Sequence, residues 1–261
     1  MTRRQVVNSL LFAGATSPLT SAALGLATPN AVAERKMAKL TLPDGQRALR
    51  AWWQEPVGQK PKAHLVLLHG SGERGDDLTA VLGNGVDEFM DQAAAQGWTV
   101  CAPQLEEGAI WEPRRLHALA KYLAQQHPTA LPLQALGISL GGYGVWHWLW
   151  QYGADLAAGV SICGGWHGKL PTSCSSRRVP VRAYHGADDD VVPLALQQKM
   201  VDAHRACGAT VEFTIYPGVT HGAWIPAFKD AALLPWLHLH LSPPDPMVAP
   251  RDAISLATDK G

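Results

Sequence analysis

The sequence predicts an α/β fold with a mostly parallel central sheet and helices on both of its faces. Short apolar segments that end near glycine or proline alternate with longer segments of helical composition. A strand that is buried on both faces of a parallel sheet has this apolar character, and the intervening helix leads back to the next parallel strand. With 261 residues, of which 47% are hydrophobic, the chain can bury a sizeable core as one domain.

The chain opens its sheet with a hairpin and continues as strand and helix in alternation. Residues 39–55 read KLTLPDGQRALRAWWQE, in which Asp44-Gly45 is a strong turn signal between two apolar stretches. Six more strands are expected at 64–70, 98–103, 131–139, 158–164, 181–186 and 211–218. Helices are expected at 86–97, 113–127, 141–153 and 193–208.

The amino terminus resembles an export signal. Arg3-Arg4 precede a weakly apolar segment that ends at the small-residue sequence Ala31-Val32-Ala33. We expect residues 1–33 to be a twin-arginine signal peptide, with an ordinary Sec signal or an amphipathic first helix as the alternatives. The remaining chain is expected to be a domain at 34–241 followed by a loosely attached tail at 242–261, and to be periplasmic or secreted.

Charge and hydropathy exclude several classes of partner. Acidic and basic residues balance at 22 each, so no single-sign field is expected to attract nucleic acid. Beyond the signal, no segment has the 18 or more apolar residues that a membrane span needs, so no span is expected in the mature chain. The sequence says nothing about the oligomeric state.

The four cysteines fit an oxidising compartment without defining a framework. Cys163 and Cys174 are the only close pair and could form a disulfide. Cys101 and Cys207 are expected to be small buried hydrophobic residues. Because the cysteines and histidines show no zinc-ligand spacing, we expect no metal.

Ser139 has the setting of a nucleophile. In LGISLGGYGVW (136–146) it lies between Gly137 and Gly141, directly after an apolar strand and before a helix. Such a turn strains the backbone and raises the hydroxyl above the sheet, while the glycines leave out the Cβ atoms that would collide. At the start of the helix, the backbone N–H of Leu140 is free to donate to an oxyanion.

A serine hydroxyl needs a base and an orienting acid, and both follow in the chain. Three aspartates come after the strand in VRAYHGADDDVVP (181–193), and His221 follows the last strand in IYPGVTHGAW. The three groups lie at three separate strand ends, which meet at one edge of a parallel sheet. An oxyanion-hole donor is expected from the glycine-rich loop in LLHGSGERGDD (67–77).

These four segments resemble the α/β-hydrolase superfamily, in particular its dienelactone hydrolase and carboxylesterase/phospholipase branch, with polyhydroxybutyrate depolymerase-like and predicted peptidase relatives. The resemblance covers about Leu65 to Leu237 and implies an α/β-hydrolase fold. In that family two residues separate the HG pair from the acid, and laid on His185-Gly186 this pattern implies Asp189, with Asp188 and Asp190 as the alternatives. The family pattern also implies Ser71 as the second oxyanion donor, with Gly72 next.

Dienelactone hydrolases use a cysteine nucleophile, whereas this chain has Ser139, so their substrate does not carry over. The segment between Gly164 and Pro180 is too short for a large cap domain. The active site is therefore expected to be open, which suits bulky or surface-borne esters. Trp111, Trp166 and Trp224 follow strand ends and are expected to line a substrate pocket.

The sequence thus predicts an exported serine hydrolase that cleaves carboxylic esters of small or oligomeric substrates through Ser139, His221 and Asp189, with no cofactor. One alternative is a serine peptidase that acts on small peptides. Another is a non-catalytic binding protein with the same fold.

Overall fold

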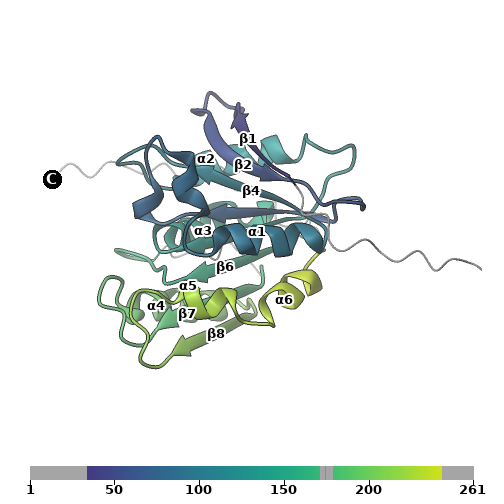
Figure 1. Ribbon diagram of the computed structural model, residues 1–261. Coiled ribbons are helices and arrows are strands. Elements are labelled where there is room, and N and C mark those ends of the chain that lie inside the picture. The colour runs from purple at the N-terminus through teal and green to yellow at the C-terminus, as the bar shows by residue number, and fades with distance from the viewer. Residues whose placement is uncertain (1–33, 171–173, 175–178, 243–261) are drawn as a thin grey trace, which may run out of the picture. The chain divides into compact units, whose positions relative to one another are not determined.

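Eight strands form one sheet in the computed structural model, which describes residues 34–170, 174 and 179–242 (Figure 1). The strands are β1 (Arg35–Leu40), β2 (Leu49–Gln54), β3 (Ala63–Leu68), β4 (Trp98–Gln104), β5 (Leu133–Ile138), β6 (Ala158–Ile162), β7 (Val181–Gly186) and β8 (Val211–Tyr216). Their order across the sheet is β1-β2-β4-β3-β5-β6-β7-β8. Only the β1–β2 and β2–β4 pairs are antiparallel, so the mostly parallel sheet is confirmed.

The hairpin at the start of the sheet is also confirmed. β1 and β2 pair in antiparallel register from Arg35–Gln54 to Leu40–Leu49. Asp44 and Gly45, in the connection, have φ angles of 61° and 67°. Two successive residues with positive φ give the tight turn that an Asp-Gly pair favours.

Helices cover both faces of the sheet. The α-helices are α1 (Val86–Ala95), α2 (Pro113–Leu123), α3 (Leu140–Tyr152), α4 (Leu194–Ala206), α5 (Trp224–Phe228) and α6 (Leu233–Leu239), and three short 3₁₀ helices are η1 (Ser71–Glu73), η2 (Leu78–Leu82) and η3 (Gly153–Asp155). The first four α-helices lie where the sequence predicts them.

Two hydrophobic clusters hold these layers together, one on each face of the sheet. Along β3, Val66 and Leu68 pack into the cluster with α2, α3 and α4, while Leu65 and Leu67 pack into the cluster with α1, α5 and α6. Successive side chains of a strand point to opposite faces, so a strand buried on both sides is apolar throughout. Trp146, Trp148 and Trp150 of α3 are buried in the first cluster.

The cysteine pairing differs from the expectation. Cys174 forms a disulfide with Cys207, the residue after α4, and Cys163 is a free, buried thiol at the end of β6. The suggested Cys163–Cys174 bridge is therefore wrong, because β6 turns Cys163 into the core beneath the carboxyl edge of the sheet. The expectation of a buried, unpaired thiol holds for Cys101 but not for Cys207.

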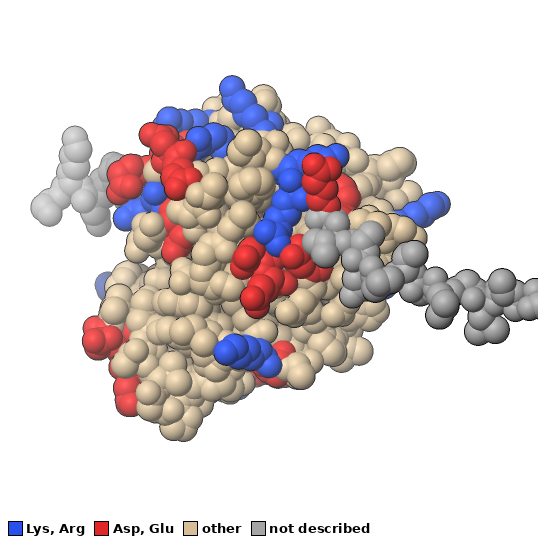
Figure 2. All heavy atoms as spheres, viewed as in Figure 1, with Lys and Arg blue, Asp and Glu red and all other residues tan. Residues whose placement is uncertain are grey.

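Several expectations concern parts of the chain outside the described residues, namely the signal peptide at 1–33 and the tail beyond Ser242. Among the described helices, none combines the length and the apolar character needed to cross a membrane. On the face shown in Figure 2, acidic and basic side chains are interspersed and leave broad uncharged areas between them.

Candidate active site

Ser139 occupies a strained turn between β5 and α3. Its φ and ψ angles are 52° and −114°, in a region that side chains rarely adopt. The neighbouring glycines make this turn possible, because a Cβ on Gly137 would lie 2.1 Å from the carbonyl oxygen of Gly141, and a Cβ on Gly141 would lie 1.9 Å from that of Leu68. The turn leaves the hydroxyl of Ser139 above the carboxyl edge of the sheet.

The structure brings Ser139, His221 and Asp189 together from three strand ends. The Nε2 atom of His221 lies 2.9 Å from the Oγ of Ser139. Its Nδ1 atom lies 2.9 Å from Oδ2 and 3.1 Å from Oδ1 of Asp189. When Nδ1 donates to the carboxylate, Nε2 is left as the acceptor of the serine proton, which is the arrangement of a Ser-His-Asp triad.

Asp189 alone of the three consecutive aspartates is buried, whereas Asp188 and Asp190 are exposed. The backbone N–H groups of Val191 and Val192 donate to its Oδ1 atom at 3.0 and 2.8 Å. Burial pushes the pKa of Asp189 upward, but the hydrogen bonds from His221 and the two amides outweigh it, and the pKa lies below its usual value. The carboxylate therefore stays charged and keeps its hydrogen bond to the imidazole of His221.

His185 adds a further contact to the acid. Its Nε2 atom lies 2.8 Å from the carbonyl oxygen of Val192 and 3.3 Å from Oδ2 of Asp189. Burial lowers the pKa of His185, so the ring is neutral and its N–H points at these oxygens. At the sequence level, His185 is a histidine at a strand end for which family resemblance implies a structural role, and the folded acid loop shows which oxygens it contacts.

The loops that carry His221 and Asp189 are joined by their backbones. Ala187 N donates to Tyr216 O at 2.9 Å, and Asp188 N donates to Val219 O at 3.0 Å. The histidine loop lies directly on Gly186, where a Cβ would come within 2.1 Å of the Val219 carbonyl oxygen. These contacts fix the two loops relative to one another before any substrate binds.

The two expected oxyanion donors flank the nucleophile. Leu140 is the first residue of α3, where a backbone N–H has no acceptor within the helix. Ser71 begins η1, and Gly70 before it lies so close to the nucleophile that a Cβ there would be 3.6 Å from the Cβ of Ser139. Neither amide donates a hydrogen bond to a described residue, so both can donate to a substrate oxygen.

His69 fixes the peptide that links Gly70 to Ser71. Its Nε2 atom accepts from Leu105 N at 3.0 Å, which places the ring proton on Nδ1, and Nδ1 lies 2.5 Å from Gly70 O. Burial lowers the pKa of His69 to about 4, so the ring remains neutral. Because the C=O and N–H of a trans peptide point in opposite directions, holding the Gly70 carbonyl also directs the Ser71 N–H.

Glu73 and Arg74 brace the same loop, each through a partner elsewhere. The amide of Asn84 donates to Glu73 Oε1 at 2.9 Å. Arg74 donates from Nε to Ser71 O at 2.9 Å and from Nη1 to Ala109 O at 3.2 Å. Backbone carbonyls thus occupy the guanidinium, which holds the loop in place.

The three tryptophans expected in the pocket have different positions. Trp111 is 4% exposed and donates its indole N–H to His69 O at 3.0 Å, and Trp166 is 7% exposed and stacks on His147 with a 4.1 Å centroid separation. Both support the site from behind and offer little surface to a substrate. Trp224 is half-buried and meets His221 edge to face at 5.6 Å, so it is the member of the three that is placed to contact a substrate.

One potential metal-binding group coincides with the triad. The thiol of Cys163 lies with ligand atoms of Asp189 and His221 inside a 4.8 Å span. The carboxylate is already hydrogen-bonded to the imidazole, and burial raises the pKa of the thiol, which disfavours the thiolate that a metal would need. These residues therefore fit acid–base chemistry better than metal binding.

Comparisons with known proteins agree with this architecture. Residues 135–233 match the phospholipase/carboxylesterase family model, which covers Ser139, Asp189 and His221. No curated protein matches the chain significantly. Among solved structures, the chain is similar to a thermostable esterase with 23% identity and a TM-score of 0.71, over 80% of this chain and 63% of that one, so it spans just under two thirds of that esterase.

Two further solved structures have lower identity but match over nearly their whole length. An esterase of Pyrococcus furiosus is 17% identical, with a TM-score of 0.63 over 80% of this chain and 94% of that one. A dienelactone hydrolase from Anabaena variabilis is 16% identical, with a TM-score of 0.62 over 81% of this chain and 100% of that one. The chain has the α/β-hydrolase fold, as predicted from the sequence, and these findings support its assignment to the α/β-hydrolase superfamily.

Proposed function

We propose that this α/β-hydrolase is an exported serine esterase that cleaves carboxylic esters through an acyl-enzyme intermediate. The observation that carries the proposal is the chain of contacts from Asp189 through His221 to Ser139, with distances of 2.9 Å at both steps. The match to the phospholipase/carboxylesterase family and the esterases among the structural neighbours support an esterase-type hydrolase.

In the first half of the reaction, His221 Nε2 takes the proton of Ser139 as its Oγ attacks the ester carbonyl. The carbonyl oxygen becomes an oxyanion that accepts from the N–H groups of Ser71 and Leu140. His221 then gives its proton to the leaving alcohol as the tetrahedral intermediate collapses to the acyl-enzyme. Asp189 keeps the imidazole in the correct tautomer and stabilises its charged form.

The second half repeats these steps with water. His221 removes a proton from a water molecule, which attacks the acyl carbonyl of the Ser139 ester. The same two amides stabilise the second oxyanion, and the proton returns to Ser139 Oγ as the carboxylic acid leaves. This cycle needs only groups of the chain and water.

The test is kcat/KM on p-nitrophenyl esters from acetate to palmitate, measured for the parent chain, Ser139→Ala and the exposed control Ser242→Ala. Removing a triad nucleophile costs on the order of 10⁶-fold in kcat. We expect that loss only in Ser139→Ala, together with loss of labelling by a fluorophosphonate probe. Activity that survives this substitution, or a parent chain that hydrolyses no ester and takes no label, would refute the proposal.

The export part of the proposal rests on the Arg3-Arg4 pair and the small-residue site at Ala31-Val32-Ala33. It predicts that Arg3→Lys combined with Arg4→Lys keeps the protein in the cytoplasm of a bacterial host. Fractionation followed by mass measurement of the exported chain tests this and locates the cleavage site. Unimpaired export of the double variant would instead favour a Sec signal.

A further inference from the structure

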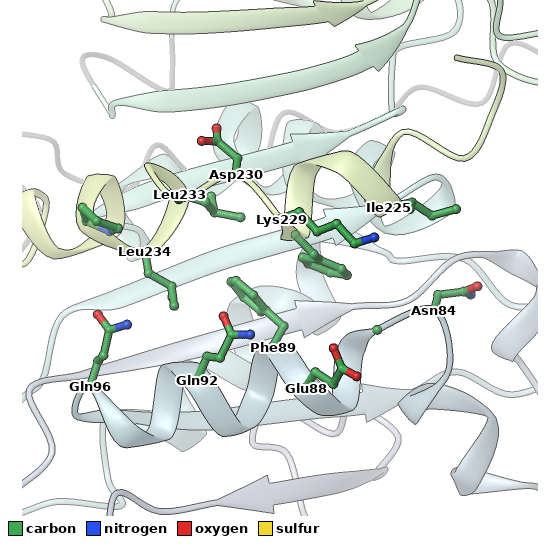
Figure 3. A pocket seen from close by; sticks show the side chains of 14 residues that line it. Asn84, Glu88, Phe89, Gln92, Gln96, Ile225, Lys229, Asp230, Leu233 and Leu234 are labelled. Atoms are coloured by element: carbon green, nitrogen blue, oxygen red, sulfur yellow. The ribbon is translucent and has the colours of Figure 1, made fainter. Parts of the chain in front are cut away.

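A groove with a volume of about 580 Å³ lies between α1 and the α5–α6 segment, apart from the triad (Figure 3). This volume is within the range of small-molecule binding sites. Figure 3 shows Glu88, Gln92 and Gln96 extending from α1 toward α5 and α6, with Asn84 and Ile225 at one end of the groove and Gln96 at the other. The mechanism proposed above uses none of these residues.

The α1 wall of the groove is polar. Glu88, Gln92 and Gln96 follow one another at four-residue spacing along one side of α1 and its C-cap, and Asn84 lies in the turn just before the helix. All four are exposed, and the side chains of Glu88, Gln92 and Gln96 make no hydrogen bond to a described residue. At a rise of about 1.5 Å per residue, the row from Glu88 to Gln96 is about 12 Å long.

The opposite wall is largely aliphatic. Ile225, which is 56% exposed, Ala231 and Pro235 give it its apolar surface, with Lys229 among them and the buried Leu233 and Leu234 beneath. At the base of the groove, Phe228 stacks on the buried Phe89 with a 4.8 Å centroid separation. The groove therefore offers hydrogen-bonding groups along one side and apolar surface along the other.

One end of the groove adjoins the candidate active site. Asn84 hydrogen-bonds Glu73 of the oxyanion loop. Ile225 follows His221 by four residues, and its Cδ1 would be 3.5 Å from a Cβ on the intervening Gly222. The groove thus begins where the oxyanion loop and the histidine loop meet α1 and α5.

We propose that this groove binds the part of an oligomeric ester that extends beyond the scissile bond. The bound chain is uncharged and extended, with carbonyl oxygens toward the amide donors of Gln92 and Gln96 and aliphatic groups toward Ile225, Ala231 and Pro235. This inference rests on the proposed esterase function and specifies the substrate class of that site.

Charge and surface chemistry favour this occupant over the alternatives. Glu88 and Lys229 contribute opposite charges, and Asp230 is paired with Arg182 at 3.2 Å, so the groove has no net field to select a charged ligand. A fatty acyl chain would leave the polar row of α1 without partners. A glycan would use open aromatic faces for stacking, whereas Phe228 has a face against Phe89.

The test is isothermal titration calorimetry with the full chain carrying Ser139→Ala. The ligands are lactic acid oligomers of one to six units, blocked at both ends. Each unit adds about 3.6 Å, as a peptide residue does, so about three to four units span the row from Glu88 to Gln96. We expect the affinity to rise on the order of 10-fold to 100-fold from one to four units and then to level off.

Two tryptophan substitutions on α1 form the matched comparison. Gln92→Trp fills the middle of the groove and should abolish the gain with length. Ala95→Trp places the same side chain at an exposed position of α1 that does not line the groove, and should leave the gain unchanged. Affinity independent of length, or the same length dependence in Gln92→Trp, overturns the proposal.

Blocked alanine peptides of equal length distinguish the ester chain from a peptide, because they differ from the lactic oligomers only in having N–H for the ester oxygen. Tighter binding of the alanine series overturns the ester assignment. Since Ser139→Ala measures binding without turnover, absence of hydrolysis in the parent chain would refute the esterase function alone. Length-independent binding would refute the groove proposal alone.

Discussion

His221 Nδ1 lies 2.9 Å from Oδ2 of Asp189, a carboxylate that two backbone amides already hold in place. The residues before and after it, Asp188 and Asp190, have the same carboxyl group but are exposed. Position and burial, rather than residue type, therefore determine which aspartate orients the imidazole.

This relationship predicts a sharp difference among three isosteric substitutions. Asp189→Asn removes the charge and favours the wrong imidazole tautomer, and should lower kcat on the order of 10⁴-fold. Asp188→Asn and Asp190→Asn should change kcat by less than about 3-fold, because neither side chain contacts His221. Steady-state kinetics on a p-nitrophenyl ester compares the three. A comparable loss in either control would mean that another carboxylate serves as the acid.

A second prediction concerns His69, which we regard as a positioning residue. His69→Ala releases the Gly70 carbonyl and lets the Ser71 N–H turn away from the oxyanion, so kcat should fall on the order of 10²-fold while KM changes little. His69→Asn restores a donor near Nδ1 and should recover part of this loss. Equal losses in both variants, or a change in KM alone, would show that His69 does not act through the Ser71 amide.

The sequence predicted the sheet and the positions of Ser139 and His221 at strand ends because both follow from local chemistry. Apolar segments bounded by turn residues mark buried strands, and Ser139 and His221 stand at strand ends in patterns that few other roles require. The choice of Asp189 from three neighbours came from family resemblance, and the structure supplies its physical reason, the burial and amide contacts of that one side chain.

Features that depend on long-range packing could not be predicted from the sequence. Cys207 meets Cys174 because α4 ends beside the segment that follows β6, a proximity that sequence spacing does not reveal. Trp111 and Trp166 follow strand ends as expected, but their loops turn them inward. The groove between α1 and α6 is formed by residues more than 120 positions apart, from Gln96 to Leu233, so no local pattern indicates it.

The Cys174–Cys207 disulfide should contribute to stability. The bridge closes a loop with a sequence separation of 33 residues, and the loss of chain entropy in the unfolded state corresponds to about 3 to 4 kcal/mol. Cys174→Ser combined with Cys207→Ser should lower the free energy of unfolding in urea by about this amount. Dithiothreitol should destabilise the parent chain and leave the double variant unchanged. Equal sensitivity of both proteins to the reductant would contradict the assigned pairing.

Acid should destabilise the fold through buried neutral histidines. Burial lowers the pKa of both His64 and His69 from 6.5 to about 4. Between pH 6.5 and 4 the unfolded chain therefore binds more protons than the folded chain, so the free energy of unfolding falls as the pH falls through this window. Each residue accounts for roughly 3 kcal/mol at most, and its effect levels off below about pH 4.

Urea unfolding at pH 7, 5.5 and 4.5 measures this dependence. His64→Phe should make the slope shallower, because it removes one of the buried neutral histidines. His238→Gln, at an exposed position of α6, should keep the slope of the parent chain. A slope that is the same in His64→Phe and the parent would show that His64 does not contribute to the acid sensitivity.

The turn at Ser139 should tolerate no side chain at Gly141. A Cβ there would lie 1.9 Å from Leu68 O and 2.9 Å from His69 O, both backbone atoms that cannot move without disturbing β3 and the oxyanion loop. Gly141→Ala should therefore cost more than about 4 kcal/mol or prevent folding. Gly72→Ala is the matched control in the same region, because a Cβ at Gly72 meets no atom within 4 Å. Circular dichroism and urea unfolding should therefore show a destabilised Gly141→Ala protein and a stable Gly72→Ala protein. A stable, active Gly141→Ala protein would mean that α3 can move away from β3. The close contact would then not be what holds Ser139 in place.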